Sequence, residues 1–140
     1  MKRFIGFIII FIIILLTNAC TAKLIDTKSG KPEVIIRNTT IEKVKEKIIE
    51  KFIQRGDQIE QEGPHNLVIT IKKMTFAGEV IRIHYTFSFY QNGGDVWVVS
   101  DVSIPKYEGM VGTRFYKMAY EFTQDLLLSI KNDIENNQSM

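Results

Sequence analysis

Alternation of apolar and polar residues over nine positions limits the possible folds of this chain more than any other feature. From Ile81 to Phe89 every odd position is Ile, Tyr or Phe. The even positions between them hold Arg82, His84, Thr86 and Ser88. Side chains of a β-strand point alternately to opposite faces, so this pattern predicts a strand with one apolar and one polar face. The apolar face needs a second layer to cover it, and the polar face is left for solvent or a partner.

Four other segments predict strands that join this one. Residues 32–37 are short and rich in β-branched residues. The two-residue period begins at Asp57, before a turn at 62–64, and residues 67–72 alternate after that turn. Residues 96–104 follow the sequence Asn-Gly-Gly-Asp at 92–95, which tolerates positive φ and is typical of a tight hairpin turn. The short turn predicts that residues 96–104 pair antiparallel to the strand at 81–89.

The first helix is predicted between residues 39 and 56. Thr39 and Glu42 have the spacing of a capping box, and Gly56 can end the helix in the left-handed conformation. The apolar side chains at helical spacing are Ile41, Val44, Ile48, Phe52 and Ile53. The Lys and Glu residues between them are interpreted as a solvated face.

A longer helix is predicted from about Thr113, which can cap its start, to Asn136. Its expected core stripe is Phe115, Met118, Phe122, Leu126, Ile130 and Ile134, widened by Ala119 and Leu127. Phe122 and Leu126 lie in the middle of the stripe, so we expect them in the core. The element order β-α-β-β-β-β-α predicts an α+β two-layer sandwich over residues 32–140, an antiparallel sheet with two helices on one face.

The N-terminal 20 residues predict where the protein is located. Lys2 and Arg3 precede an apolar run, 4–16, whose 13 residues are fewer than the roughly 20 that a membrane-spanning helix needs. A basic start, a short apolar run and small residues before a cleavage point are typical of a secretory signal peptide. We therefore expect residues 1–19 to be removed.

Cys20 is the only cysteine and stands directly after this leader. A lone thiol in an exported protein has no disulfide partner, and lipidation would remove it. We expect Cys20 to be the lipidated first residue and residues 20–31 to be a tether. Ordinary signal cleavage, with a chance cysteine at this position, is the alternative.

The leader, Ala19-Cys20, the short tether and one compact domain resemble small bacterial envelope lipoproteins. Thr17 departs from the family pattern, which prefers Leu, Val or Ile three residues before the cysteine. Thr21 is not the Asp that commonly signals inner-membrane retention in bacteria with two membranes, so the resemblance implies outer-membrane delivery on the periplasmic side. The element order is similar to the helix-grip domains of lipoproteins attached to the outer-membrane β-barrel assembly machinery, a similarity of fold alone.

Charge and composition argue against several functions. Removal of the leader reduces the 18 basic residues to 16, which equal the 16 acidic residues and leave no excess for a nucleic acid. The two histidines have no second ligand at metal-binding spacing, so we expect no metal and no cofactor. A catalytic trio of Ser88, His84 and Asp101 can be written on paper, as in any chain of this size, and we expect no enzymatic activity.

The strand at 96–104 is apolar on both faces, because Trp97 and Val99 alternate with valines. If the helices cover one face, Trp97 and Val99 lie on the other face with Arg82 and His84. These four residues are the expected surface for an envelope protein partner. Three alternatives remain open: Trp97 packs in the core; the tether or the loop at 106–112 covers it; or the domain binds a small apolar ligand between sheet and helices, lined by Tyr85, Phe87 and Phe89.

Overall fold

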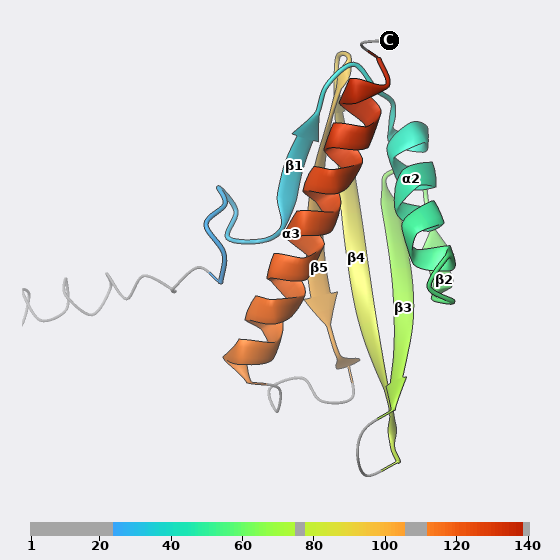
Figure 1. Ribbon diagram of the computed structural model, residues 1–140, viewed down its shortest axis with the longest axis vertical. Helices are drawn as coiled ribbons and strands as arrows, with labels where there is room; N and C mark the ends of the chain where they lie inside the picture. Colours follow the sequence, from blue (N-terminus) through green and yellow to red (C-terminus); the bar gives the residue numbers. More distant parts are fainter. Residues whose placement is uncertain (1–23, 75–77, 106–111, 139–140) are drawn as a thin grey trace, which may run out of the picture.

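The computed structural model describes residues 24–74, 78–105 and 112–138. Its elements are β1 (Glu33–Ile36), α2 (Ile41–Ile53), β2 (Gln58–Glu62), β3 (Asn66–Met74), β4 (Val80–Asn92), β5 (Asp95–Ser103) and α3 (Thr113–Asn136). All strand pairs are antiparallel, and both helices lie on one face of the sheet (Figure 1). The predicted α+β two-layer fold is confirmed.

The strand order is β1-β5-β4-β3-β2, so the first two strands along the chain are the two edges of the sheet. The chain leaves β1 at one edge and crosses to the other through α2, and β2 to β5 then return by successive hairpins. The turn between β4 and β5 contains Gly93 at φ +61°. A positive φ is readily adopted by glycine, which explains why the strands can be joined so tightly there.

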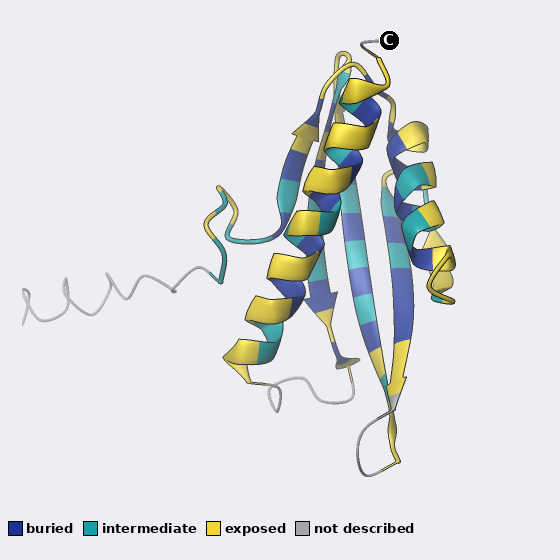
Figure 2. Ribbon diagram, viewed as in Figure 1, coloured by how far each residue is buried: buried dark blue, intermediate teal, exposed yellow. Residues whose placement is uncertain are grey.

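The predicted alternation in β4 builds the core. Tyr85, Phe87 and Phe89 are at most 6% exposed, whereas the residues between them are half-buried on the other face, as the banding of β4 in Figure 2 shows. Phe52 of α2 packs against this row, with its ring centroid 5.6 Å from that of Tyr85 and 6.0 Å from that of Phe87. The apolar face of the sheet is therefore the face that the helices cover.

The start of α2 differs by one residue from the prediction. Thr40, not Thr39, is the N-cap, and its hydroxyl accepts a hydrogen bond of 3.4 Å from the amide of Lys43. Ile53 is 54% exposed although it was expected to be buried. It follows Phe52 directly, and neighbouring side chains of a helix point about 100° apart, so only one of them can face the sheet.

α3 has the predicted bounds, but its buried face is rotated. Gly112 is its N-cap and supplies no side-chain bond, so Thr113 is not the cap. The buried residues are Ala119, Tyr120, Thr123, Leu127, Ile130 and Ile134. Thr123 fits this face because its hydroxyl donates to the carbonyl of Ala119, four residues earlier.

The prediction that Phe122 lies in the core is wrong. Phe122 is 39% exposed and Met118 is 61% exposed, whereas Leu126 is partly buried against the core. The guanidinium of Arg55 lies 4.9 Å from the centre of the Phe122 ring, so this ring contacts the end of α2 rather than the sheet. The rotation of α3 turns Phe122 to the flank of the helix layer.

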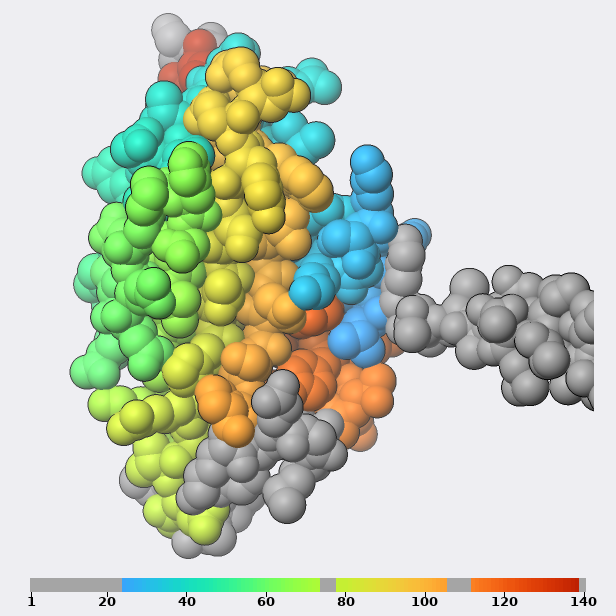
Figure 3. Space-filling model, turned by 180° about the vertical axis from the view of Figure 1, so that it is seen from behind, coloured from blue at the N-terminus to red at the C-terminus, as the bar shows by residue number. Residues whose placement is uncertain are grey.

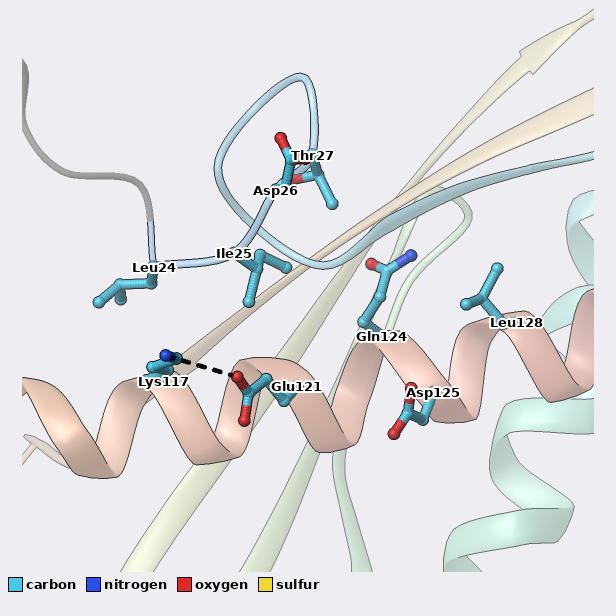
Figure 4. Close-up of a pocket in the computed structure, with 9 residues that line it drawn as sticks. All are labelled: Leu24, Ile25, Asp26, Thr27, Lys117, Glu121, Gln124, Asp125 and Leu128. Atoms are coloured by element: carbon cyan, nitrogen blue, oxygen red, sulfur yellow. Dashed lines mark ion pairs between the residues drawn. The ribbon is translucent and has the colours of Figure 1, made fainter.

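The described part of the predicted tether packs against the domain. Leu24 and Ile25 contact the core, and the hydroxyl of Thr27 donates to the carbonyl of Lys31 over 2.6 Å. Residues 24–27 and α3 together line a hollow of about 850 Å³, and Figure 4 shows Gln124 projecting from the helix at its border. Cys20 and the predicted signal peptide lie outside the described residues. Among the residues that are described, no helix combines the length and apolar character needed to cross a membrane.

Candidate interaction surface

The sheet face opposite the helices carries the residues predicted to bind a partner. Seen from behind, side chains of β3, β4 and β5 form the surface (green, yellow and orange in Figure 3), and the first described residues lie along one side. We call this the outer face. The helices do not cover it, and the described part of the predicted tether contacts it only along the β1 side, where the Ser29 amide donates to Glu33 and Lys31 pairs with Asp101. The loop at 106–111 lies outside the described residues.

Three large apolar side chains form a row across the outer face. The register places Trp97 of β5 between Ile35 of β1 and Tyr90 of β4. Ile35 is 55% exposed, Trp97 37% and Tyr90 52%, and the rings of Tyr90 and Trp97 have centroids 5.1 Å apart. We call these three residues the outer row. Val99 lies on the same face of β5 and is half-buried beside Glu33 and Ser88.

Polar groups surround the outer row. The indole N–H of Trp97 donates to a carboxylate oxygen of Glu33 over 3.3 Å, which holds the ring against β1. A hollow of about 600 Å³ runs beside the row and round the edge of β1 to α3. Its lining residues include Lys28, Asn92, Asp95, Leu128 and Lys131. The arrangement is an apolar centre with a mixed-charge border and an adjoining hollow.

α3 closes the free edge of β1 with polar side chains. The side-chain amide of Gln124 accepts from the Glu33 N–H over 2.8 Å and donates to the Glu33 carbonyl over 3.0 Å. Lys131 donates to the carbonyl of Ile35 over 2.7 Å, and Glu135 accepts from the amide of Arg37 over 3.0 Å. These side chains take the place of a neighbouring strand, so β1 offers few free backbone groups for pairing with another chain.

The opposite edge of the sheet, β2, is protected differently. β2 has five residues, all exposed, and its pairing with β3 shifts between Ile59 and Gln61. A short, irregular and charged edge is a poor template for an added strand. With both edges unsuited to strand pairing, the outer face is the surface of the sheet best suited to contact another molecule.

Asp101 joins the N-terminal segment, β5 and α3. Its carboxylate pairs with the ammonium of Lys31 and accepts a hydrogen bond from the hydroxyl of Tyr120. Partial burial would raise the pKa of Asp101, but the hydrogen bonds from Lys31, Tyr120 and the Val102 amide, together with the charge of Lys31, outweigh burial and lower the pKa. Burial, together with the bond to Asp101, raises the pKa of Tyr120, so its phenol stays protonated. These contacts hold the N-terminal segment and α3 against β5.

Arg82 and His84 lie on the outer face, as predicted, but far from Trp97. Trp97 pairs with Tyr90, and Arg82 is eight residues from Tyr90 along β4, roughly 26 Å at the rise of a strand. His84 contacts Glu60 through Nδ1 over 3.1 Å, and the same carboxylate accepts from the hydroxyl of Thr70. The four predicted residues therefore form two separate groups, one around Trp97 and Val99 and one around Arg82 and His84.

The possible catalytic trio is not assembled. Ser88 and His84 are four residues apart on β4, roughly 13 Å, and Asp101 is bonded to Lys31 and Tyr120 instead of a histidine. Glu60 contacts both Thr70 and His84, so the histidine is not placed as a base for that hydroxyl. Within the described residues, no three His, Cys, Asp or Glu side chains are grouped so that they could hold a metal ion.

Comparison with known proteins does not assign a family to this fold. Neither a scan of protein-family models nor a search of curated proteins found a match to this chain. A functional proposal therefore depends on the outer row, the closed edges and the N-terminal sequence.

Proposed function

We propose that this protein is a non-enzymatic lipoprotein of the bacterial cell envelope that binds another envelope protein through its outer row. The observation that carries the proposal is the exposure of Ile35, Trp97 and Tyr90 side by side on a face that no described element covers. Clusters of exposed aromatic residues inside a polar border are typical of the energetic centre of a protein interface.

The neighbouring groups support a protein partner. Aromatic side chains lose little conformational entropy when they are buried, and Trp97 is already held by Glu33 and Tyr90. Lys131 and Asp95 on the border can form polar contacts round an apolar centre. The hollow beside the row can receive a side chain of the partner. Binding through paired strands is disfavoured, because α3 occupies the edge of β1.

The lipid anchor is the second part of the proposal. Cys20 follows Thr17, Asn18 and Ala19 and is the only cysteine, so we propose that it carries the lipid. Thr21 favours the outer membrane, with the domain on its periplasmic side. The intact mass of the protein extracted from the envelope should exceed that of residues 20–140 by the acyl and glyceryl groups. An unmodified Cys20 or a retained leader would refute the anchor.

Site-specific photo-cross-linking in the native host tests the partner surface. A benzoylphenylalanine at position 90 lies in the outer row, and the same residue at position 118 is the matched control. Met118 is also an exposed apolar side chain, but it belongs to the helix layer. We expect one discrete cross-linked species from position 90 that Trp97→Ala abolishes, and none from position 118. Cross-links from position 118 alone would assign the interface to the helices.

A small apolar ligand is the second candidate. The ligand site predicted between sheet and helices is disfavoured, because Tyr85 and Phe87 pack against Phe52 instead of lining a cavity. The hollow beside Trp97 favours a ligand on the other side of the sheet, since its volume of about 600 Å³ is in the usual range of ligand pockets. Native mass spectrometry of the protein purified from its host would reveal a bound small molecule, which Trp97→Ala should release.

A further inference from the structure

Three basic residues without an ion pair to any described residue lie close together in sequence and register where the β3–β4 hairpin leaves the sheet: Lys72 and Arg82 on the outer face, and Lys73 on the opposite face. Lys72 pairs directly with Arg82 across the two strands, and Lys73 follows Lys72. Within the described part of the chain, none of the three is in an ion pair, and Lys72 and Arg82 are both exposed on the outer face. Like charges directly opposite each other on neighbouring strands destabilise a sheet. We call Lys72, Lys73 and Arg82 the basic cluster.

Many of the other described cations contact a carboxylate, although the side chains of Arg37 and Lys43 are in no ion pair with a described residue. Seven of these other cations lie within 4.0 Å of a carboxylate, namely Lys31, Lys45, Lys47, Lys51, Arg55, Lys117 and Lys131. Residues 71–83, by contrast, contain three basic residues and one acidic residue, Glu79. The basic cluster therefore has a local excess of positive charge in a protein whose predicted mature chain has none.

Two surface hollows adjoin the basic cluster. Lys72 and Arg82 line one of about 220 Å³ together with Gln58, Glu60 and Thr70. Lys72 and Lys73 line another of about 340 Å³, together with Arg55 and Asp57. Glu60 and Asp57 are acidic, but Glu60 is bonded to Thr70 and His84, and Asp57 lies 3.9 Å from Arg55. The ammonium and guanidinium groups are left to receive anionic groups from outside.

We propose that the basic cluster binds the anionic headgroups of the membrane surface beside the domain. This inference rests on the proposed lipid at Cys20, because the anchor brings the domain to a membrane. Leu24 lies against α3 near Lys117, and the four residues from Leu24 back to Cys20 span at most about 14 Å. The N-terminal end of α3 and the β3–β4 hairpin are at the same end of the molecule (Figure 1). The domain would thus touch the bilayer with this end and leave the outer row exposed to a partner.

A membrane explains this charge arrangement better than a nucleic acid does. Nucleic-acid binding draws its affinity from many phosphate contacts, and it is favoured by a basic protein. Here three cations stand on a neutral domain. Basic residues near an anionic bilayer each add roughly 1 kcal/mol of binding energy, so a small cluster is enough to orient a domain that a lipid already anchors.

Vesicle sedimentation tests the inference without the lipid anchor. The protein would be residues 20–140 with Cys20→Ser, which retains every described residue and carries no acyl chain. The probes are vesicles of phosphatidylglycerol and phosphatidylcholine in equal parts, vesicles of phosphatidylcholine alone, and a DNA duplex. The test variant is Lys72→Glu with Arg82→Glu. The control, Arg37→Glu with Lys43→Glu, changes the net charge equally at two other exposed cations without ion pairs among the described residues.

We expect the protein to bind the anionic vesicles alone. The affinity should fall when the salt concentration is raised from low millimolar to physiological, and it should be about tenfold or more lower in the test variant. The control variant should bind within about twofold of the parent, and circular dichroism should show both variants folded. Equal binding to neutral vesicles, equal loss in both variants, or tighter binding to DNA than to the vesicles would overturn the inference. Such a failure would count against the basic cluster alone. The protein used in the assay carries no lipid and its outer row is unchanged, so the proposed anchor and the proposed partner surface do not depend on the result.

Discussion

The two faces of β5 differ in burial although both are apolar over residues 96–99. Val96 and Val98 are fully buried under the helices, whereas Trp97 between them is 37% exposed on the outer face. In β4 the outer positions from Arg82 to Ser88 are instead polar, with Thr86 and Ser88 between buried aromatic residues. Polar side chains are expected on a strand face that contacts solvent, but an exposed Trp beside Tyr90 and Ile35 is not. The candidate surface is therefore indicated by large apolar residues at positions where the alternation calls for polar ones, and not by apolar residues in general.

Substitutions on the two faces of the sheet should differ most in their effect on the free energy of unfolding. Phe87→Ala removes a fully buried ring that packs on Phe52, and such truncations typically cost about 3–5 kcal/mol. Thr86→Ala, one residue away on the outer face, should cost far less. Urea unfolding of both variants measures the difference. Similar losses would mean that the outer face is covered in the intact protein.

Loss of the edge closure should have the next largest effect. Gln124→Ala removes both hydrogen bonds to the backbone of Glu33, and we expect it to lower the free energy of unfolding by about 1–3 kcal/mol. Asp125→Ala is the control, because Asp125 is the exposed neighbour on the same helix. Gel filtration should also show some association of Gln124→Ala through the opened edge. Identical unfolding and elution for the two variants would refute a role for Gln124.

The rotation of α3 predicts a smaller loss at Phe122. Phe122→Ala should cost about 1 kcal/mol, since the ring is partly exposed and its contact with Arg55 is of the kind worth about 0.5–1 kcal/mol. Leu127→Ala, at a fully buried position, should cost about 2–5 kcal/mol. A larger loss of unfolding free energy for Phe122→Ala than for Leu127→Ala, measured by chemical denaturation, would show that Phe122 is a core residue.

The contacts of Asp101 with Lys31 and Tyr120 should make a small, pH-dependent contribution to the free energy of unfolding. The folded pKa of Asp101 is lowered, so its stabilisation is present above the ordinary aspartate pKa of about 3.9 and is lost as the pH falls through the folded value. The effect should stay below about 1 kcal/mol, because Lys31 and Asp101 are both 45% exposed. Asp101→Asn should therefore lower the urea midpoint at neutral pH, and the gap should narrow on acidification. A gap that widens in acid would contradict this sign.

The sequence predicted the strands and the long helix well because their patterns are local. Alternation fixed the inward face of β4, and α3 begins and ends at the predicted residues. The rotation of α3 could not be predicted in the same way. Phe122 and Leu127 are five residues apart, roughly 140° round a helix, and each lies on a stripe that is largely apolar. Only packing on the sheet selects between the two stripes.

The surface could be predicted only in part. The apolar outer side of β5 indicated Trp97, but Arg82 was assigned to the same surface without regard to register. A tight turn at 92–95 sets Tyr90 opposite Trp97, which puts Arg82 at the other end of the strand. The edge closure was missed, although Gln124, Lys131 and Glu135 follow helical spacing, because polar stripes usually face solvent.

One paired measurement on Trp97→Ala tests the central claim most directly. The urea unfolding curve and the yield of the cross-link from position 90 would be recorded for the same variant. If the outer row is a binding surface, the free energy of unfolding should fall by clearly less than the roughly 3–5 kcal/mol expected for Phe87→Ala, because Trp97 is 37% exposed, while the cross-link disappears. A loss as large as that of Phe87→Ala would place Trp97 among the core residues. An undiminished cross-link on a stable protein would show that the partner does not bind there.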